Sequence, residues 1–322
     1  MTDITITPQE AAIAERLRGG HPHYAFRRAV KLQTRARAAL LGGAGSGKTY
    51  TALVLASALG KRTAVIETVH PQAAEYADDF DFDLCPPLTF CSADALVAAL
   101  AECQALGYET VIVDSYSLFW SGNGGIRDQA NEAAKPGPGG HNAGWNAVRP
   151  YERRMWDALF AYDGHVIVTM RTKTDHVVEI DEHGRSTMRR FAGKPEHRDG
   201  AEHEFNFVGI MHSDHTLEVT KALSVNLADE FVNRPGPEFA AKVRQWLDAG
   251  EPLPPLTPVA DLIAEARRPD ATVGELKALW RHVKDRFLDD VLIADDDGES
   301  LIALAMYIER RGMAMEELAG VA

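Results

Sequence analysis

The chain has 322 residues, of which 45% are hydrophobic and 25% are charged, and its formal net charge is −13. Such a length accommodates one large domain with an appendage, and such a composition is that of an ordinary globular protein. No apolar run approaches the ~20 residues that cross a bilayer, and the first residues lack the basic and apolar regions of a secretory signal. We therefore expect a cytoplasmic protein with no membrane partner.

The negative charge is unevenly distributed along the chain. Residues 251–322 carry fifteen acidic and eight basic side chains and so hold −7 of the net −13. The rest of the chain is only mildly acidic and contains local basic clusters. Because phosphate binding depends on the local patch, the net charge does not exclude a nucleic-acid partner.

Strand-like and helical segments alternate from the N-terminus onwards. Residues 8–18 favour a short helix, and residues 27–37 form a basic segment. The expected strands lie at 37–41, 63–67, 87–91, 110–114 and 164–170. The expected helices lie near 47–59, 72–79, 92–106 and 148–162. This alternation predicts an α/β fold with a mostly parallel central sheet and helices on both faces.

The pattern changes in three places. Residues 205–211 and 216–221 are adjacent strands that we expect to extend the sheet as an antiparallel pair. Two long segments, 116–147 and 171–204, show no regular pattern apart from a hairpin expected around 182–185. Irregular segments of this length inside a compact domain are usually functional or disordered.

These boundaries divide the chain into four regions. They are an N-terminal helix and basic segment (1–36), an α/β core (37–250), a Pro-rich linker (251–258) and a small acidic C-terminal region with helical patterning only (259–322). One hypothesis is that Asp289, Asp290 and Asp295–Asp297 mimic phosphates and occupy basic loops of the core. The alternative is a solubilising helical domain.

The most informative motif is G-x-x-x-x-G-K-[ST], which residues 42–49 fit. Its glycines permit positive φ and let backbone N–H groups converge on phosphate oxygens. Lys48 supplies a charge to the β- and γ-phosphates, and the Thr49 hydroxyl is a ligand for Mg²⁺. An apolar strand precedes the loop and a helix follows it, as this motif requires. The residues expected to bind ATP are Gly42, Gly43, Ala44, Gly45, Ser46, Gly47, Lys48, Thr49 and Tyr50.

A second motif is the apolar strand 110–114, which ends in Asp114. An aspartate at this position holds the Mg²⁺ shell in P-loop proteins. The next residue is Ser115, where many ATPases carry the glutamate that activates water. If ATP is hydrolysed, the base must therefore come from another strand.

Two further groups of residues carry less information. Cys85, Cys91 and Cys103 are odd in number and lack C-x-x-C spacing, so buried reduced thiols are expected. His212 and His215 have the spacing of metal ligands, but no third ligand is in view, and we do not expect zinc.

Six segments within residues 26–223 are distinctive: the P-loop stretch, AEYADDFDFD, VIVDSYSLFW, GHVIVTMRTKT, EHRDGAEHEF and LEVTK. Together they resemble the phage-encoded RecA-like ATPases of the single-strand annealing and recombination type. The resemblance implies a RecA-like core over 37–250, with ATP and Mg²⁺ as cofactors. It also implies single-stranded DNA as a partner, a homo-oligomeric filament or ring, and a location in the host cytoplasm. A single-stranded-DNA-binding protein is a further candidate partner.

The resemblance assigns roles to single residues. Lys48, Thr49 and Asp114 match the nucleotide–Mg²⁺ site. Arg171 matches a position that senses the γ-phosphate, and Lys221 matches a lysine that reaches the ATP of a neighbouring subunit. A surface arginine and an ordinary strand-end lysine are the alternatives for these two.

One position departs from the family pattern. Val69 stands where the catalytic glutamate is expected, and Glu67 stands where the family usually has aspartate. Because valine cannot polarise water, we hypothesise weak, DNA-stimulated turnover with Glu67 as the base.

The two long segments occupy the places of the DNA-binding loops of RecA-like cores. The second contains Phe191 among basic residues, and Trp120 and Trp145 bracket the first. A positive groove with stacking side chains suits binding of single strands. The alternative is a solvated hairpin of mixed charge. The expected DNA-binding residues are Lys173, Arg185, Arg189, Arg190, Lys194 and Arg198.

The leading interpretation is an ATP-binding recombination protein that binds single-stranded DNA and promotes annealing or strand pairing. One alternative is a helicase-loader or packaging-type ATPase. Another is a nucleotide-gated assembly module without significant hydrolysis.

Overall fold

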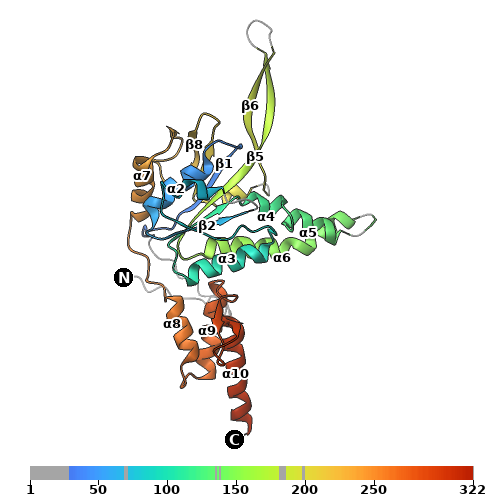
Figure 1. The fold of residues 1–322 in the computed structure, drawn as a ribbon, viewed down its shortest axis with the longest axis vertical. Coiled ribbons are helices and arrows are strands. Elements are labelled where there is room, and N and C mark those ends of the chain that lie inside the picture. Colours follow the sequence, from blue (N-terminus) through green and yellow to red (C-terminus); the bar gives the residue numbers. More distant parts are fainter. Residues whose placement is uncertain are drawn as a thin grey trace, which may run out of the picture.

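One large, mostly parallel sheet organises the computed structural model, which describes residues 29–68, 72–134, 136–137, 139–180, 186–197 and 200–321 (Figure 1). The strands along the sheet are β3 (Asp83–Leu84), β2 (Thr63–Glu67), β4 (Thr110–Asp114), β5 (His165–Ile180), β1 (Arg37–Gly42), β7 (Phe207–Met211), β8 (Thr216–Ala222) and β9 (Phe231–Asn233). The strands from β3 to β7 run parallel, whereas β8 and β9 add antiparallel to the edge. The predicted α/β fold is confirmed.

Helices cover both faces of the sheet, which explains why the central strands are apolar along their whole length. In β2 every residue is buried, and β1 and β4 each have one half-buried end. Strands buried on both faces read as continuous apolar runs rather than alternating ones. One face packs against α3 (Ala93–Ala105) and α6 (Gly140–Ala161). The other face packs against α2 (Lys48–Leu59) and α7 (Pro237–Asp248).

The connection between β2 and α3 differs from the prediction. The expected helix at 72–79 is a single 3₁₀ turn, η1 (Ala73–Tyr76). The expected strand at 87–91 is wrong, because only the bridge between Thr68 and Leu88 lies there and the edge strand β3 comes earlier. Pro86 and Pro87 have no N–H to donate, so the ladder breaks between Cys85 and Leu88.

The first long segment is helical rather than irregular, so that expectation is wrong. It contains α4 (Ser117–Ser121), α5 (Ile126–Ala133) and the first turns of α6. Its glycines serve turns and close contacts, as at Gly144, where α6 meets α5. Trp120 and Trp145 are half-buried against the core and lie 5.5 Å apart, ring centre to ring centre.

The second long segment contains a pair of antiparallel strands on either side of the predicted hairpin turn, and the turn itself (182–185) lies outside the described residues. Strand β5 continues past the end of the sheet and pairs antiparallel with β6 (Ser186–Pro195). Figure 1 shows this pair, here called the arm, projecting away from the body of the protein. Lys173, Arg189, Arg190 and Lys194 lie on its two strands. Arg185 and Arg198 lie outside the described residues.

The C-terminal region forms a small unit with its own core. Its elements are α8 (Val259–Arg267), α9 (Val273–Asp285), β10 (Leu292–Ala294), β11 (Leu301–Ala303) and α10 (Leu304–Val321). The hairpin of β10 and β11 corrects the expectation of helices only. The unit includes Ala101 of α3 in its core and lies at the opposite end of the molecule from the arm (Figure 1).

The acidic side chains of this unit are engaged locally, which contradicts the hypothesis that they mimic phosphates. Arg154 of α6 contacts Asp289 at 3.1 Å and Asp290 at 2.8 Å. Lys284 contacts Asp289 at 2.9 Å, and Arg310 pairs with Asp295. Because these carboxylates have cationic partners at the end of the molecule far from the arm, they do not cover the basic strands of the arm.

The contact between α5 and α6 predicts a steric effect on stability. A Cβ at Gly144 would lie 2.2 Å from the carbonyl oxygen of Ala130, which is backbone and cannot rotate away. We expect Gly144→Ala to lower the free energy of unfolding by about 1–3 kcal/mol. Gly312→Ala is the matched control, because nothing lies within 4 Å of a Cβ there. Because Gly312 lies inside α10, Gly312→Ala should raise the free energy of unfolding by about 0.5–1 kcal/mol. Urea unfolding followed by circular dichroism measures both, and equal effects would contradict the assignment.

Candidate functional site

The loop between β1 and α2 is shaped to receive phosphate. Gly47 has a φ of 93°, in the left-handed region, and directly precedes the helix. A Cβ at Gly42 would lie 2.6 Å from the carbonyl oxygen of Met211, so only glycine allows the loop to rest against β7. The loop lies at the carboxyl ends of the parallel strands, where open α/β sheets bind ligands.

Lys48 folds back over this loop. Its Nζ donates a hydrogen bond to the carbonyl oxygen of Gly43 at 2.6 Å. Burial lowers the pKa of Lys48, while the Asp114 carboxylate raises it and the Arg171 guanidinium lowers it. The ammonium group is thus held beside the glycine-rich backbone, next to the position of the β- and γ-phosphates in P-loop proteins.

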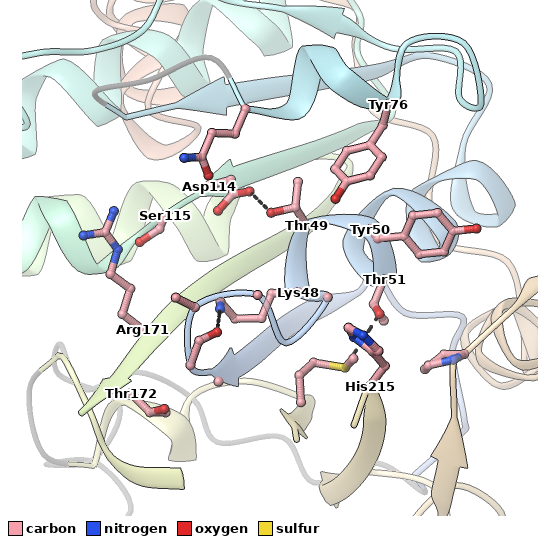
Figure 2. Close-up of a pocket in the computed structure, with 18 of the residues that line it drawn as sticks. Lys48, Thr49, Tyr50, Thr51, Tyr76, Asp114, Ser115, Arg171, Thr172 and His215 are labelled. Carbon is pink, nitrogen blue, oxygen red and sulfur yellow. Dashed lines mark hydrogen bonds between the residues drawn. The ribbon is translucent and has the colours of Figure 1, made fainter. Parts of the chain in front are cut away.

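The Asp114 carboxylate is held between two hydroxyl groups. Thr49 Oγ1 donates to Asp114 Oδ2 at 2.5 Å, and Thr169 Oγ1 donates to Oδ1. Figure 2 shows the contact between Thr49 and Asp114. A hydroxyl and a carboxylate oxygen in contact are hard ligands that suit Mg²⁺. Together with the phosphate-shaped loop, this donor set fits ATP with a bound magnesium ion.

The loop opens into a cleft of about 1170 Å³, large enough for a nucleotide. One wall comes from β2 and the segment after it, and the other comes from the turns that follow β7 and β9. A third side is formed where the arm joins the sheet. The lining side chains outside the P-loop include Glu67, Gln72, Tyr76, Asp114, Arg171, Thr172, Glu196, His215 and Arg234.

Comparison with known families agrees with this geometry. The AAA domain family matches residues 34–228, which is more than half of the chain. The chain belongs to the AAA domain family of P-loop ATPases. A comparison with curated proteins found no match. Within the described residues, no helix of this AAA protein is long and apolar enough to cross a membrane.

Glu67 of the AAA protein lies in the cleft but is tightly engaged. It is 1% exposed, and its Oε1 accepts a hydrogen bond from the backbone N–H of Ala73 at 2.7 Å. Its Oε2 is buried and has no hydrogen-bond partner in the described part of the chain. Burial raises the pKa of Glu67 above its ordinary value, the bond from Ala73 opposes this, and Asp114 adds to it. Glu67 thereby ties β2 to the turn at Ala73–Tyr76. Val69 lies outside the described residues.

The remaining predicted site residues separate into two groups. Tyr50 and Arg171 line the cleft, on opposite sides of Lys48 (Figure 2). Tyr50 is 44% exposed and makes edge contacts with Tyr76 and Phe80. Lys221 is not in this cleft. It lies on β8 and pairs with Val208 of β7, at the amino-terminal end of the parallel strands, and its Nζ donates to the carbonyl oxygen of His203.

Sequence reasoning missed several lining residues. His215 lies in the turn after β7, with its Nδ1 3.3 Å from the carbonyl oxygen of Ser46. Arg234 follows β9 and donates its backbone N–H to the His215 carbonyl oxygen. Glu196 follows the arm strand β6. The position of His215 in a turn between two adjacent strands could have indicated it, since such turns lie at the edge of a sheet. No local sequence pattern indicated that Glu196 or Arg234 lines the cleft.

The cysteines and the histidine pair have ordinary surroundings. Cys85, Cys91 and Cys103 are free thiols, and burial raises the pKa of each. His212 Nε2 lies 2.8 Å from Glu218 Oε2. Among the described residues, no three His, Cys, Asp or Glu side chains gather as a metal site would require.

The raised pKa of Glu67 predicts how stability changes with pH. Because its pKa is raised, Glu67 binds its proton more tightly in the folded state than in the unfolded chain. Protonated Glu67 therefore contributes its full stabilisation at pH values below the pKa that it has in the unfolded chain. This contribution is lost as the pH rises through the pKa that Glu67 has in the folded state. Glu67→Gln stays neutral and keeps an acceptor for Ala73. We expect the unfolding free energy of the wild type, relative to Glu67→Gln, to fall from acid to neutral pH.

Urea titrations at a series of pH values measure this difference. Glu75→Gln is the control, because Glu75 is exposed in the same turn. The difference in unfolding free energy between the wild type and Glu67→Gln should therefore change with pH. A difference that stays constant would show that the surroundings of Glu67 do not raise its pKa.

Proposed function

We propose that this AAA protein is a Mg²⁺-dependent ATPase that binds single-stranded DNA through its arm and promotes annealing or strand pairing as a homo-oligomer. The observation that carries the proposal is the path of β5. Its first half lies in the sheet between β1 and β4, beside the nucleotide cleft, and its second half forms the arm. One strand therefore joins the site for ATP to the candidate surface for DNA.

The ATP part of the proposal rests on the loop and the Asp114 contacts. Backbone N–H groups and Lys48 neutralise the phosphates, while Thr49 and Asp114 hold the magnesium ion. That ion supplies charge neutralisation of the β- and γ-oxygens when it is bound. Arg171 lies in register with Gly42, the first residue of the loop, and is exposed to the cleft, where it can contact a γ-phosphate.

The DNA part of the proposal rests on the arm and its sequence. Its strands carry Lys173, Arg189, Arg190 and Lys194, and Arg185 stands between them in the sequence. Asp175 and Glu179 also lie on β5, so the positive charge gathers on β6. A projecting two-stranded ribbon with one basic strand offers an extended surface to a single strand of DNA. Annealing or strand pairing requires that two strands be presented together, which suits a homo-oligomer with one arm on each subunit. A phage origin and a single-stranded-DNA-binding partner belong to the same proposal.

Two alternative functions predict different behaviour of the same protein. A helicase-loader or packaging-type ATPase would act on duplex DNA or on a partner protein without annealing strands. A nucleotide-gated assembly module would bind ATP and change its sedimentation without releasing phosphate. Lys221, at the amino-terminal end of the parallel strands and away from its own cleft, is proposed to contact the ATP of a neighbouring subunit.

The nucleotide site is tested by Lys48→Ala. Loss of a charged hydrogen-bond donor to phosphate costs about 1.5–3 kcal/mol, so we expect ATP affinity to fall about 10- to 100-fold. The control is Lys61→Ala, an exposed lysine just beyond α2. Titration of both variants with a fluorescent ATP analogue, and phosphate release with and without single-stranded DNA, give the result. Unchanged affinity in Lys48→Ala would contradict the assignment.

The DNA surface is tested by salt dependence. Each phosphate contact made by a single strand adds about 0.7 to the slope of log affinity against log salt concentration. Successive residues of a strand lie on opposite faces, so a single strand on one face of the arm reaches one of Arg189 and Arg190. We expect the double change Arg189→Ala, Arg190→Ala to reduce this slope by about 0.7 for a single-stranded oligonucleotide, whichever face binds it. Arg281→Ala is the control, because Arg281 is exposed on α9 in the unit far from the arm. A slope that does not change, or an oligonucleotide that does not bind with ATP present, would exclude the arm as the DNA site.

A further inference from the structure

ATP hydrolysis requires a group that positions or deprotonates the attacking water, and carboxylates are the usual base. The carboxylates among the described lining residues of the cleft are Glu67, Asp114 and Glu196. Both oxygens of Asp114 accept hydrogen bonds, from Thr49 and Thr169. Asp114 is thus committed to the magnesium side of the site.

Glu67 is poorly placed to take a proton from water. One of its oxygens accepts the N–H of Ala73, and the other is buried. A base that exchanges protons with a water at the γ-phosphate must reach that water. Glu67 instead holds the turn at Ala73–Tyr76 against the cleft.

Glu196 is in a different position. Its backbone N–H donates to the carbonyl oxygen of Arg171 at 2.7 Å, and Arg171 pairs with Gly42 at the start of the P-loop. Its side chain is half-buried and lines the cleft. With the described residues its carboxylate makes no hydrogen bond or ion pair. A carboxylate with no partner among the described residues therefore stands beside the candidate γ-phosphate sensor, one strand away from the phosphate-binding loop.

We infer that Glu196 is the catalytic base of ATP hydrolysis and that the arm delivers it to the cleft; this rests on the ATPase activity proposed above. The oxygen of water attacks the γ-phosphorus while the bond to the β,γ-bridging oxygen breaks. Glu196 takes a proton from the water, the products are ADP and inorganic phosphate, and the proton then passes from Glu196 to solvent.

The position of Glu196 also accounts for control by DNA. Glu196 directly follows Pro195, the last residue of β6, while Arg171 and Thr172 lie on β5 where the arm leaves the sheet. Glu196, Arg171 and Thr172 line the cleft. Both strands of the arm thus bring a side chain to the nucleotide cleft, so a strand of DNA held on the arm acts on the base and the γ-phosphate sensor together. Hydrolysis should depend on DNA for this reason.

The test compares Glu196→Gln with Glu67→Gln and with Glu204→Gln, a control at an exposed glutamate nearby. Each full-length variant is measured for ATP affinity, for single-turnover hydrolysis at saturating ATP and single-stranded DNA, and for the pH dependence of that rate. We expect Glu196→Gln to hydrolyse about 100-fold more slowly. Its ATP and DNA affinities should stay within about twofold of the wild type, and its rate should lose the fall at acidic pH. The hydrolysis rate of Glu67→Gln should fall less than that of Glu196→Gln, and Glu204→Gln should hydrolyse ATP at the wild-type rate.

Two results would overturn the inference. One is hydrolysis by Glu196→Gln within about threefold of the wild type. The other is a larger loss of the hydrolysis rate in Glu67→Gln than in Glu196→Gln. A wild-type protein that does not bind ATP, or that binds ATP but releases no phosphate with or without DNA, would instead refute the proposed ATPase function itself.

Discussion

The hydrogen bonds around Asp114 are the interaction on which the rest of the site depends. This carboxylate ends β4 and is bonded by Thr49 from the start of α2 and by Thr169 from β5. Three elements from distant parts of the chain are thereby fixed at one edge of the sheet. Thr49 directly follows Lys48 in the chain. The hydrogen bond between Thr49 and Asp114 therefore also helps to orient Lys48 and the P-loop. Both carboxylate oxygens are bonded, so the charge is oriented before any ligand arrives.

Strand β5 gives the molecule its second organising feature. A strand of ordinary length would end beside Asp114, the last residue of β4. Strand β5 instead runs for 16 residues and leaves the sheet as half of the arm. Residues beside the γ-phosphate position and residues far out on the arm therefore share one stretch of backbone. The hydrogen bond from Glu196 to Arg171 closes the second strand onto the first at the cleft. The arm is thus attached where the chemistry occurs, and the C-terminal unit occupies the other end of the molecule (Figure 1).

Local patterns predicted some elements well and others badly, for identifiable reasons. The strands at 63–67 and 110–114 were predicted with their observed bounds, because strands buried on both faces must be apolar throughout. The Gly, Asn and Pro content of segment 116–147 predicts an irregular loop, whereas the segment is mostly helical. Its helices are stabilised by contacts between them, such as the close approach at Gly144, and tertiary contacts override weak local propensity.

The sequence by itself determined the phosphate-binding loop, because eight contiguous residues carry all its requirements for glycine, lysine and threonine. It also determined Asp114, since a buried strand that ends in an acid is a local pattern. Only the tertiary structure brought Glu196 and His215 to the same cleft, because sheet pairing places together residues that lie more than a hundred positions from the loop. It also decided that Glu67 is bonded to backbone rather than open to the nucleotide. Such contacts depend on register and burial, which no short stretch of sequence records.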